Sequence, residues 1–351
     1  MTEQPTRPGF AVVPGSTVHQ VLAGRESEVM DLVEAAYVLH GNGRTVNPPS
    51  YFLRFPDRPR SRIIALPASV GGDRPVDGIK WISSFPDNLD RGIPRASAVL
   101  ILNDPATGYP YACLESSIIS AVRTAASAAV AARTLIANRP APRRVGFIGT
   151  GLISRYIHTY LGTLGWEPEE IGVFDLDAGY AQAFADRLRP GPAGAVRRHD
   201  SVEELVRTSD VIVLATTAAT PHLTDPTWFA HHPLVLHVSL RDLGTDVVLQ
   251  SVNIVDDVEH VLKADTSVYL AEQRTGNRHF LYGTLHDVLA GRVAAPADRT
   301  VVFSPFGLGV LDLAVGEHVF DAARTEGSLT TVEGFFHDLD RHVAPSTGSR
   351  R

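Results

Sequence analysis

A strand that runs directly into a glycine-rich turn constrains the fold of this chain more than any other sequence feature. The apolar run 144–148 is followed by GTGLIS at 149–154, a G-x-G-x-x-S turn that opens a helical pattern. In such a turn the backbone N–H groups at a helix N-terminus approach a pyrophosphate. Asp175 closes the next apolar run, roughly 20 residues later, where a carboxylate binds a ribose diol and disfavours a 2′-phosphate. The motif predicts a Rossmann site for NAD rather than NADP, and the alternative is a strand-turn-helix with incidental glycines.

The rest of the nucleotide crevice should lie at the carboxyl ends of neighbouring parallel strands. Thr216 and Thr217 lie at the end of the fourth predicted strand, although both can also be plain loop residues, and Ser239 lies at the end of the fifth. The candidate cofactor-binding residues are Gly149, Gly151, Leu152, Ile153, Ser154, Asp175, Thr216, Thr217 and Ser239.

From residue 144 onward, strand-like apolar runs alternate with helical segments of about ten residues, which predicts a doubly wound parallel sheet. The predicted strands are 144–148, 171–176, a short one near 196, 210–217, 234–240 and 253–257, and the predicted helices are 152–165, 178–188 and 201–208.

The first part of the chain has a different pattern. Its apolar residues recur at helical spacing over 26–40, and then become short β-branched or aromatic runs between 50 and 114, with a hairpin turn at 103–108. An Ala-rich helix is predicted over 116–138, ended by the Pro-rich link 139–142. A further helix is expected after residue 302, and a disordered tail over 344–351.

Composition narrows the class of protein. A chain of 351 residues exceeds a typical single domain, so two domains are expected. The formal charge of −7, without a basic block, argues against a nucleic-acid partner. The single cysteine, Cys113, the polar N-terminus and the lack of an uninterrupted apolar run of ~20 residues favour the cytoplasm and argue against a membrane anchor.

Four cations lie in apolar surroundings in the first part of the chain, and buried cations need partners. They are candidate substrate-binding residues, although a solvated strand face or a structural ion pair would explain any one of them. The four are Arg54, Lys80, Arg95 and Arg123.

The chain resembles the ornithine cyclodeaminase and μ-crystallin family over nearly its whole length. The matching stretches are GIKW, RGIPRASAVLILNDPATGYPYACLESSIISAVRTAASAAVAA, GTGLIS, TTAATPHL and FSPFGLGVLDLA. The resemblance implies that Lys80 and Arg123 bind an α-carboxylate and that Asp242, after the fifth Rossmann strand, is catalytic together with Lys80. A Gly-Ala-Asp-like turn is usual in the family, whereas this chain has SLRDL at 239–243, which shifts the aspartate by a residue. A turn aspartate that caps its own backbone is the alternative for Asp242.

The SLRDL turn, NIVDDVEH and PRASAV look most like one branch, the N-(2-amino-2-carboxyethyl)-L-glutamate dehydrogenases of 2,3-diaminopropionate biosynthesis for siderophores and antibiotics. The implied reaction is oxidation of this tricarboxylate by NAD to an imine, followed by hydrolysis to 2,3-diaminopropionate and 2-oxoglutarate. Arg95 supplies an additional guanidinium that suits an additional carboxylate. Asp242 would accept the amine proton or orient the water.

The resemblance also implies a Rossmann domain at 141–304 and a smaller α+β substrate and dimerisation domain formed by 1–140 and 305–351, with homodimers as the assembly. The alternatives are an ornithine cyclodeaminase, an alanine dehydrogenase or a ketimine reductase of the same family, or a non-catalytic nucleotide- or ligand-binding protein. His222, His237 and His260 have no compact metal-ligand spacing, so we expect structural histidines and no metal.

Overall fold

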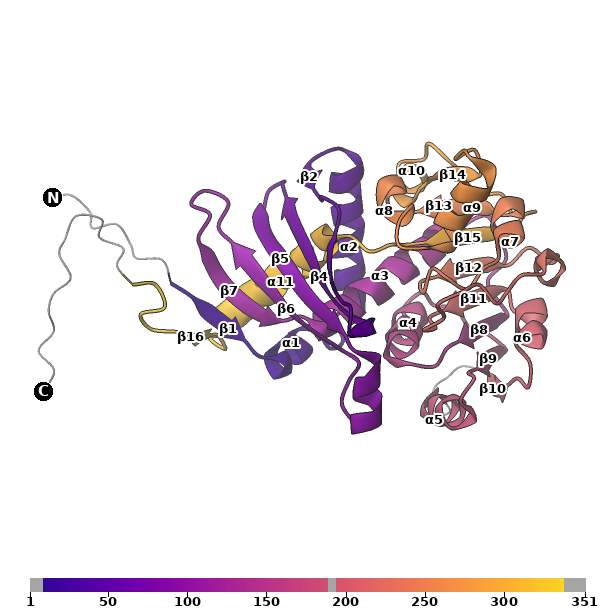
Figure 1. Cartoon of the computed structure of the whole chain (residues 1–351), viewed down its shortest axis with the longest axis horizontal. Coiled ribbons are helices and arrows are strands. Elements are labelled where there is room, and N and C mark those ends of the chain that lie inside the picture. The colour runs from indigo at the N-terminus through magenta and orange to yellow at the C-terminus, as the bar shows by residue number, and fades with distance from the viewer. Residues whose placement is uncertain (1–8, 189–193, 338–351) are drawn as a thin grey trace, which may run out of the picture.

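The computed structural model describes residues 9–188 and 194–337, which form two sheets side by side (Figure 1). The first sheet has the order β16-β1-β7-β6-β5-β4-β2, with β3 beside β4. Strands β4 to β7 pair antiparallel, and β1 is parallel to β7. The strands are β1 (Ala11–Val13), β2 (Thr45–Val46), β3 (Tyr51–Phe55), β4 (Arg58–Val70), β5 (Val76–Ser84), β6 (Ala96–Asn103), β7 (Pro110–Glu115) and β16 (Thr330–Thr331).

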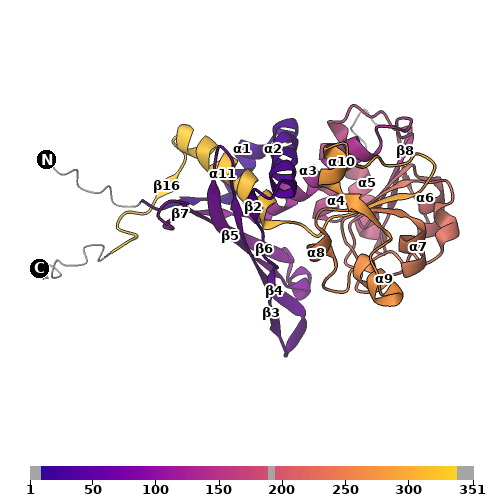
Figure 2. The ribbon, with the colours of Figure 1, turned by 90° about the horizontal axis from the view of Figure 1, so that it is seen from above.

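Helices cover one face of this sheet. Side chains alternate between the two faces of a strand, and the even-numbered residues Leu66, Leu100 and Leu102 are the buried ones. The late helix α11 packs on β4, β5 and β6 and so brings the far end of the chain back to this sheet (Figure 2). The helices on this side are α1 (Gly15–Leu22), α2 (Glu26–Gly41), α3 (Ser117–Leu135) and α11 (Gly309–Thr325), and the 3₁₀ helix η1 (Pro86–Arg91) lies in the connection between β5 and β6.

The second sheet is parallel throughout and has the order β10-β9-β8-β11-β12-β15-β13-β14. The order reverses between β8 and β11, which is where dinucleotide crevices lie in such sheets. Its strands are β8 (Arg144–Ile148), β9 (Glu170–Phe174), β10 (Ala195–Arg198), β11 (Val211–Leu214), β12 (Leu234–His237), β13 (Val252–Val255), β14 (Leu281–Thr284) and β15 (Val301–Ser304).

Helices cover both faces of the second sheet. In β11, Val211 and Val213 belong to the core that contains α3 and α4, whereas Ile212 and Leu214 pack with α6 and α7. This alternation confirms the predicted α/β fold with a doubly wound sheet. The helices are α4 (Leu152–Gly162), α5 (Ala178–Leu188), α6 (Val202–Thr208), η2 (Pro226–Phe229), α7 (Thr245–Gln250), α8 (Val258–Val261), α9 (Ser267–Thr275) and α10 (Leu285–Leu289).

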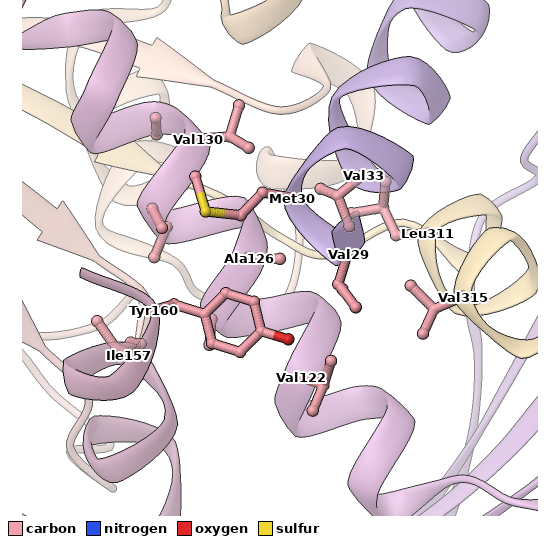
Figure 3. Packing of buried hydrophobic residues seen from close by; sticks show 14 of the residues in the cluster. Val29, Met30, Val33, Val122, Ala126, Val130, Ile157, Tyr160, Leu311 and Val315 are labelled. Atoms are coloured by element: carbon pink, nitrogen blue, oxygen red, sulfur yellow. The ribbon is translucent and has the colours of Figure 1, made fainter. Parts of the chain in front are cut away.

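Helix α3 joins the two halves through one continuous core. Figure 3 shows Val122 and Ala126 of α3 between Met30 of α2, Tyr160 of α4 and Leu311 of α11. Within the described residues, α3 is the one helix long and apolar enough to cross a membrane, but 72% of that window is buried inside the protein. Burial against other helices accounts for its apolar composition.

The structure corrects the sequence prediction at several places. Helix α3 ends at Leu135 rather than at residue 138, and the segment after residue 302 finishes strand β15 before α11 begins at Gly309. Strand β14 and helices α7 to α10 were not predicted, because such short elements show no clear period. The predicted tail 344–351 lies outside the described residues. We propose that the chain divides into its two domains after residue 140 and before residue 305, in the α3–β8 and β15–α11 connections.

Candidate active site

The glycine-rich turn lies between β8 and α4, at the reversal of strand order. Gly149 has φ 82°, and a Cβ there would lie 2.7 Å from the Ala215 carbonyl oxygen, so the turn requires glycine. Gly151 caps α4 without a side chain to satisfy the first N–H groups, and a Cβ there would meet open space. Ser154 is buried and donates to the Gly149 carbonyl, which holds helix and turn together. This turn fits a pyrophosphate at the N-terminus of α4.

Asp175 follows β9 at the same edge of the sheet. Its Oδ2 accepts hydrogen bonds from the Thr150 backbone N–H and hydroxyl, both at 2.8 Å, and its Oδ1 accepts one from the Asp177 N–H at 3.0 Å. Each carboxylate oxygen has two lone pairs, so one acceptor position remains on Oδ1 for a hydroxyl of the ribose diol. The carboxylate is therefore held against the turn in a position that suits NAD.

The remaining cofactor candidates fall into two groups. Leu152 and Ile153 belong to the first turn of α4, and Thr217 is exposed in the loop after β11. Thr216 and Ser239 instead direct their hydroxyls to the Asp242 carboxylate. These two residues connect the nucleotide crevice to the candidate catalytic residue.

Lys80 and Arg123 come together on a buried carboxylate that the sequence analysis did not identify. Lys80 Nζ donates to Asp312 Oδ2 at 2.6 Å, and Arg123 Nε donates to Asp312 Oδ1 at 3.1 Å. The side chains of Lys80, Arg123 and Asp312 are 2%, 11% and 0% exposed. Two cations share one anion, so the trio has a positive charge left over when Lys80 is protonated.

The surroundings of the trio tune its charge and shape. Burial and the neighbouring Arg123 charge lower the pKa of Lys80 to about 8, although Asp312 opposes this shift. Gly307, at φ 93°, lets the chain pass the guanidinium, because a Cβ there would lie 2.7 Å from Arg123 Nη1. Asp256 at the end of β13 accepts the Gly307 N–H at 2.7 Å and fixes this turn. The segment that leads into α11 therefore covers one side of the trio, next to Arg123.

Asp242 lies in the turn after β12 with a fully buried side chain. Its Oδ1 accepts from the Thr216 hydroxyl and lies 3.1 Å from His222 Nε2. Its Oδ2 accepts from the Ser239 hydroxyl and lies 3.3 Å from His237 Nε2. His222 has a side chain that is 38% exposed and His237 one that is 0% exposed, so His222 is the histidine of this group with access to solvent.

The charge state of Asp242 follows from these contacts. Burial raises its pKa, but the contacts with His222 and His237 and the hydrogen bond from Ser239 outweigh burial and hold the pKa well below its usual range. A carboxylate of such low pKa is a weak proton acceptor, because an efficient general base has a pKa near the working pH. Asp242 is therefore suited to orient His222 and to supply a fixed negative charge.

Arg54 and Arg95 lie at the end of the first sheet. Arg54 is exposed on β3, and Arg95 is half-buried before β6, where its Nη1 donates to the Ser84 hydroxyl at 2.6 Å. Both are separate from the Asp312 trio. His260 is held by Asp257, 2.8 Å from its Nδ1, and the described residues contain no cluster of three or more potential metal ligands.

Sequence reasoning missed Asp312 and treated His222 and His237 as isolated structural residues. One signal for Asp312 was available, since it is a lone acid in the apolar run GVLDLAV. The contact of the two histidines with Asp242 had no local signal, because β11, β12 and the loops after them must first be assembled.

Comparisons with known proteins agree with this architecture. The chain is 30% identical over 312 residues to the nodulation efficiency protein NfeD of Rhizobium meliloti, covering 87% of this chain and 93% of that protein. It is 28% identical over 327 residues to an N-((2S)-2-amino-2-carboxyethyl)-L-glutamate dehydrogenase of Staphylococcus aureus, covering 88% and 94%. The solved structure of Thermococcus litoralis Δ1-pyrroline-2-carboxylate reductase, in complex with NADH and L-proline, superposes with a TM-score of 0.85 at 24% identity, covering 92% and 100%.

The doubly wound sheet, the nucleotide turn with Asp175 and the dehydrogenase relative define the class, an NAD-dependent oxidoreductase. Within this class the chain belongs to the ornithine cyclodeaminase/mu-crystallin family, whose model matches residues 16–327.

Proposed function

We propose that this enzyme oxidises N-(2-amino-2-carboxyethyl)-L-glutamate with NAD and hydrolyses the product to 2,3-diaminopropionate and 2-oxoglutarate. The observation that carries the proposal is the excess of cations on the substrate side. Lys80 and Arg123 share one acid, and Arg54 and Arg95 form no ion pair in the part of the chain that the structure describes. A substrate with three carboxylates would compensate this charge.

The reaction balances with the groups that the site offers. When bound, NAD accepts a hydride from the Cα of the glutamate half. Loss of the amine proton leaves a C=N bond, water adds to its carbon, and cleavage of the C–N bond releases the amine and the 2-oxo acid. Lys80 and Arg123 hold the α-carboxylate and so fix the direction of the C–H bond.

We assign the proton transfer to the pair of His222 and Asp242. His222 accepts the amine proton and then orients the water, because it is the solvent-accessible histidine of the group. Asp242 is a positioning residue, which fixes the imidazole through the 3.1 Å contact and offsets the positive charge that develops on it. The catalytic role first predicted for Asp242 is thus proposed as an indirect one.

The branch assignment is supported by the S. aureus relative, whose name states this activity. Relatives named alanine dehydrogenase and ketimine reductase are 25% and 28% identical, so identity alone does not separate the branches. The excess of cations favours the tricarboxylate over alanine or a cyclic imine, each of which carries one carboxylate.

The test is a parallel assay with NAD and the tricarboxylate, ornithine or alanine, following NADH absorbance and identifying the amino-acid products. We expect NADH and 2,3-diaminopropionate only with the tricarboxylate. Turnover of ornithine or alanine instead would contradict the substrate while leaving the cofactor assignment intact. If no NADH forms with any of the three substrates, the result would contradict the proposed reaction and favour a binding protein.

We also propose that the enzyme is a cytoplasmic homodimer that supplies 2,3-diaminopropionate to siderophore or antibiotic synthesis. The dimer is supported by an apolar row on the face of the first sheet opposite Lys80. Tyr51, Trp81 and Val99 are 72%, 41% and 39% exposed and lie in one cross-strand row, with Ala65 between the first two. Exposed apolar patches of this kind mark interaction surfaces. Light scattering of wild type and Trp81→Glu tests this, with a monomer expected for the variant.

A further inference from the structure

We propose that Arg54, Arg62, Arg95 and Arg241 form a second carboxylate subsite, which binds the distal carboxylates of an amino-dicarboxylate or amino-tricarboxylate. The inference rests on the proposed function for the kind of substrate and deepens it. It assigns carboxylate binding to Arg62 and Arg241 as well. It also means that residues from both halves of the enzyme build the second subsite.

Strand register places three of these groups in one row. Arg54 of β3 lies opposite Arg62 of β4, and Arg62 lies opposite Ser84 of β5. Arg95 completes the row by donating from Nη1 to the Ser84 hydroxyl at 2.6 Å. Directly opposed residues point to the same face of a sheet, so these side chains gather on one face.

The row shares its face with the first carboxylate site. Lys80 and Ser84 are four residues apart on β5, so they point to the same side, about 13 Å apart along the strand. Long arginine side chains can reach from the row toward the site at Lys80, whose ammonium is held by Asp312. The spacing suits a substrate whose carboxylates lie at the two ends of an extended chain.

Arg241 reaches the row from the second sheet. It precedes Asp242 in the turn after β12, and it donates to the Ala264 carbonyl at 3.1 Å from Nε and 2.6 Å from Nη2. Burial lowers the pKa of Arg62, and the charges of Arg241, Arg95 and Arg54 lower it further, in that order. Arg241 therefore lies near enough for its charge to act on Arg62, and a carboxylate bound between them would bridge the two halves of the enzyme.

None of the four guanidiniums forms an ion pair with an acid among the described residues. Among the described residues, the side chains of Arg54 and Arg62 form no hydrogen bond or ion pair, and those of Arg95 and Arg241 donate only to uncharged oxygens. Burial lowers the pKa of Arg241 and the charge of Arg54 lowers it further, whereas the charges of Asp265 and Asp242 oppose this shift. By contrast, Arg60 on the same strand is paired with Asp87.

Like charges held this close are unfavourable without a counter-ion, and this cluster forms in a chain of net charge −7. A carboxylate relieves the repulsion, and it matches the planar, bidentate donors of guanidinium better than any neutral group does. The cluster is therefore a specificity site for substrates with more than one carboxylate.

Equilibrium binding separates this inference from the reaction. Titration calorimetry on the NAD-loaded enzyme would compare L-glutamate and L-2-aminoadipate, each with its side-chain amide, which has the same shape without the distal charge. We expect wild type to bind at least one of the acids about tenfold or more tightly than its amide. In Arg62→Gln and Arg241→Gln the preference should fall to near one, with the amide affinity unchanged.

Three controls keep the outcome interpretable. Arg207→Gln removes the same charge from α6, where Arg207 pairs with Glu203, and should keep the preference. Arg62→Lys should keep part of it, and thermal melting checks that each variant is folded. Equal binding of acids and amides by wild type, or an unchanged preference in Arg62→Gln and Arg241→Gln, overturns the inference. If wild type prefers the acids over the amides through Arg62 but does not turn over the tricarboxylate, the proposed reaction is wrong and the second subsite stands.

Discussion

Two buried aspartates anchor the two sides of the site, and they are held in opposite ways. Asp312, on α11, sits between the cations Lys80 and Arg123. Asp242, after β12, is surrounded by hydroxyl and imidazole groups. Both side chains are fully buried, so solvent compensates neither charge.

The difference determines which sign of charge each centre binds or stabilises. The Asp312 centre keeps a positive charge after its own pairing, so it attracts an anion such as the α-carboxylate. The Asp242 centre keeps a negative charge, so it stabilises positive charge that develops on a neighbouring imidazole or substrate nitrogen. An amino acid placed between them meets the cation with its carboxylate and the anion with its amine. The predictions below test this opposition, from the largest expected effect to the smallest.

The largest effect is expected for Asp312→Asn. It leaves Lys80 and Arg123 buried beside each other without their anion, and removal of one partner of a buried pair costs about 3 to 5 kcal/mol. Denaturant unfolding measures the loss. Asp321→Asn on the same helix is the control, because Asp321 pairs with Arg74 and Arg324 at the surface, where such pairs contribute about 0 to 1 kcal/mol. Equal stability of the two variants would show that Asp312 does not anchor the cations.

The second effect is catalytic. Asp242→Asn removes the fixed negative charge beside His222, and we expect kcat to fall about 100-fold or more with little change in KM. Asp246→Asn, where the acid is exposed and pairs with Arg274, should leave kcat unchanged. A large rise in KM with normal kcat would move Asp242 from positioning the proton acceptor to binding the substrate.

The third effect is a pH dependence confined to the cationic centre. Because the pKa of Lys80 is lowered to about 8, the free site loses its ammonium above this pH. Affinity for 2-oxoglutarate, whose own charge is constant there, should fall by up to about tenfold per pH unit. Lys80→Met should bind weakly with no dependence of this kind, and a pH-independent wild type would contradict the assigned charge.

Stability should change in the opposite direction over the same range. Between pH 8 and the ordinary lysine pKa near 10.5, the unfolded chain binds more protons at Lys80 than the folded one. The contribution of Lys80 to folding stability therefore rises with pH in this window. Comparison of wild type with Lys80→Met isolates this contribution in denaturant unfolding.

The two centres also differ in how far the sequence alone could reveal them. The nucleotide turn was predicted because Gly149, Gly151 and Asp175 belong to consecutive elements with a local spacing rule. Lys80 and Arg123 were found as cations in apolar surroundings and through a family resemblance. Their shared acid is 232 residues from Lys80 along the chain, and no local pattern connects such distant residues.

The arginine row shows the same limit in a sharper form. Arg54 and Arg95 were selected from the sequence, but Arg62 was not, since it precedes an ordinary strand run. Its importance follows from the register that sets it opposite Arg54 and Ser84. A shift of one residue would turn Arg62 to the other face, so only the assembled sheet identifies it.

The smallest expected effects are losses of folding stability when one serine is removed at each centre. Ser239 donates to the Asp242 carboxylate, whereas Ser120 accepts from Lys80 at 3.2 Å and from Arg123 at 3.4 Å. A hydrogen bond to a charged group contributes about 1.5 to 3 kcal/mol. Asp242 depends on a few neutral donors, whereas the cations near Ser120 already have Asp312. Ser239→Ala should therefore destabilise the fold by about 1.5 kcal/mol and Ser120→Ala by less than about 1 kcal/mol. The reverse order in denaturant unfolding would mean that the cationic centre, rather than the anionic one, depends on its neutral neighbours.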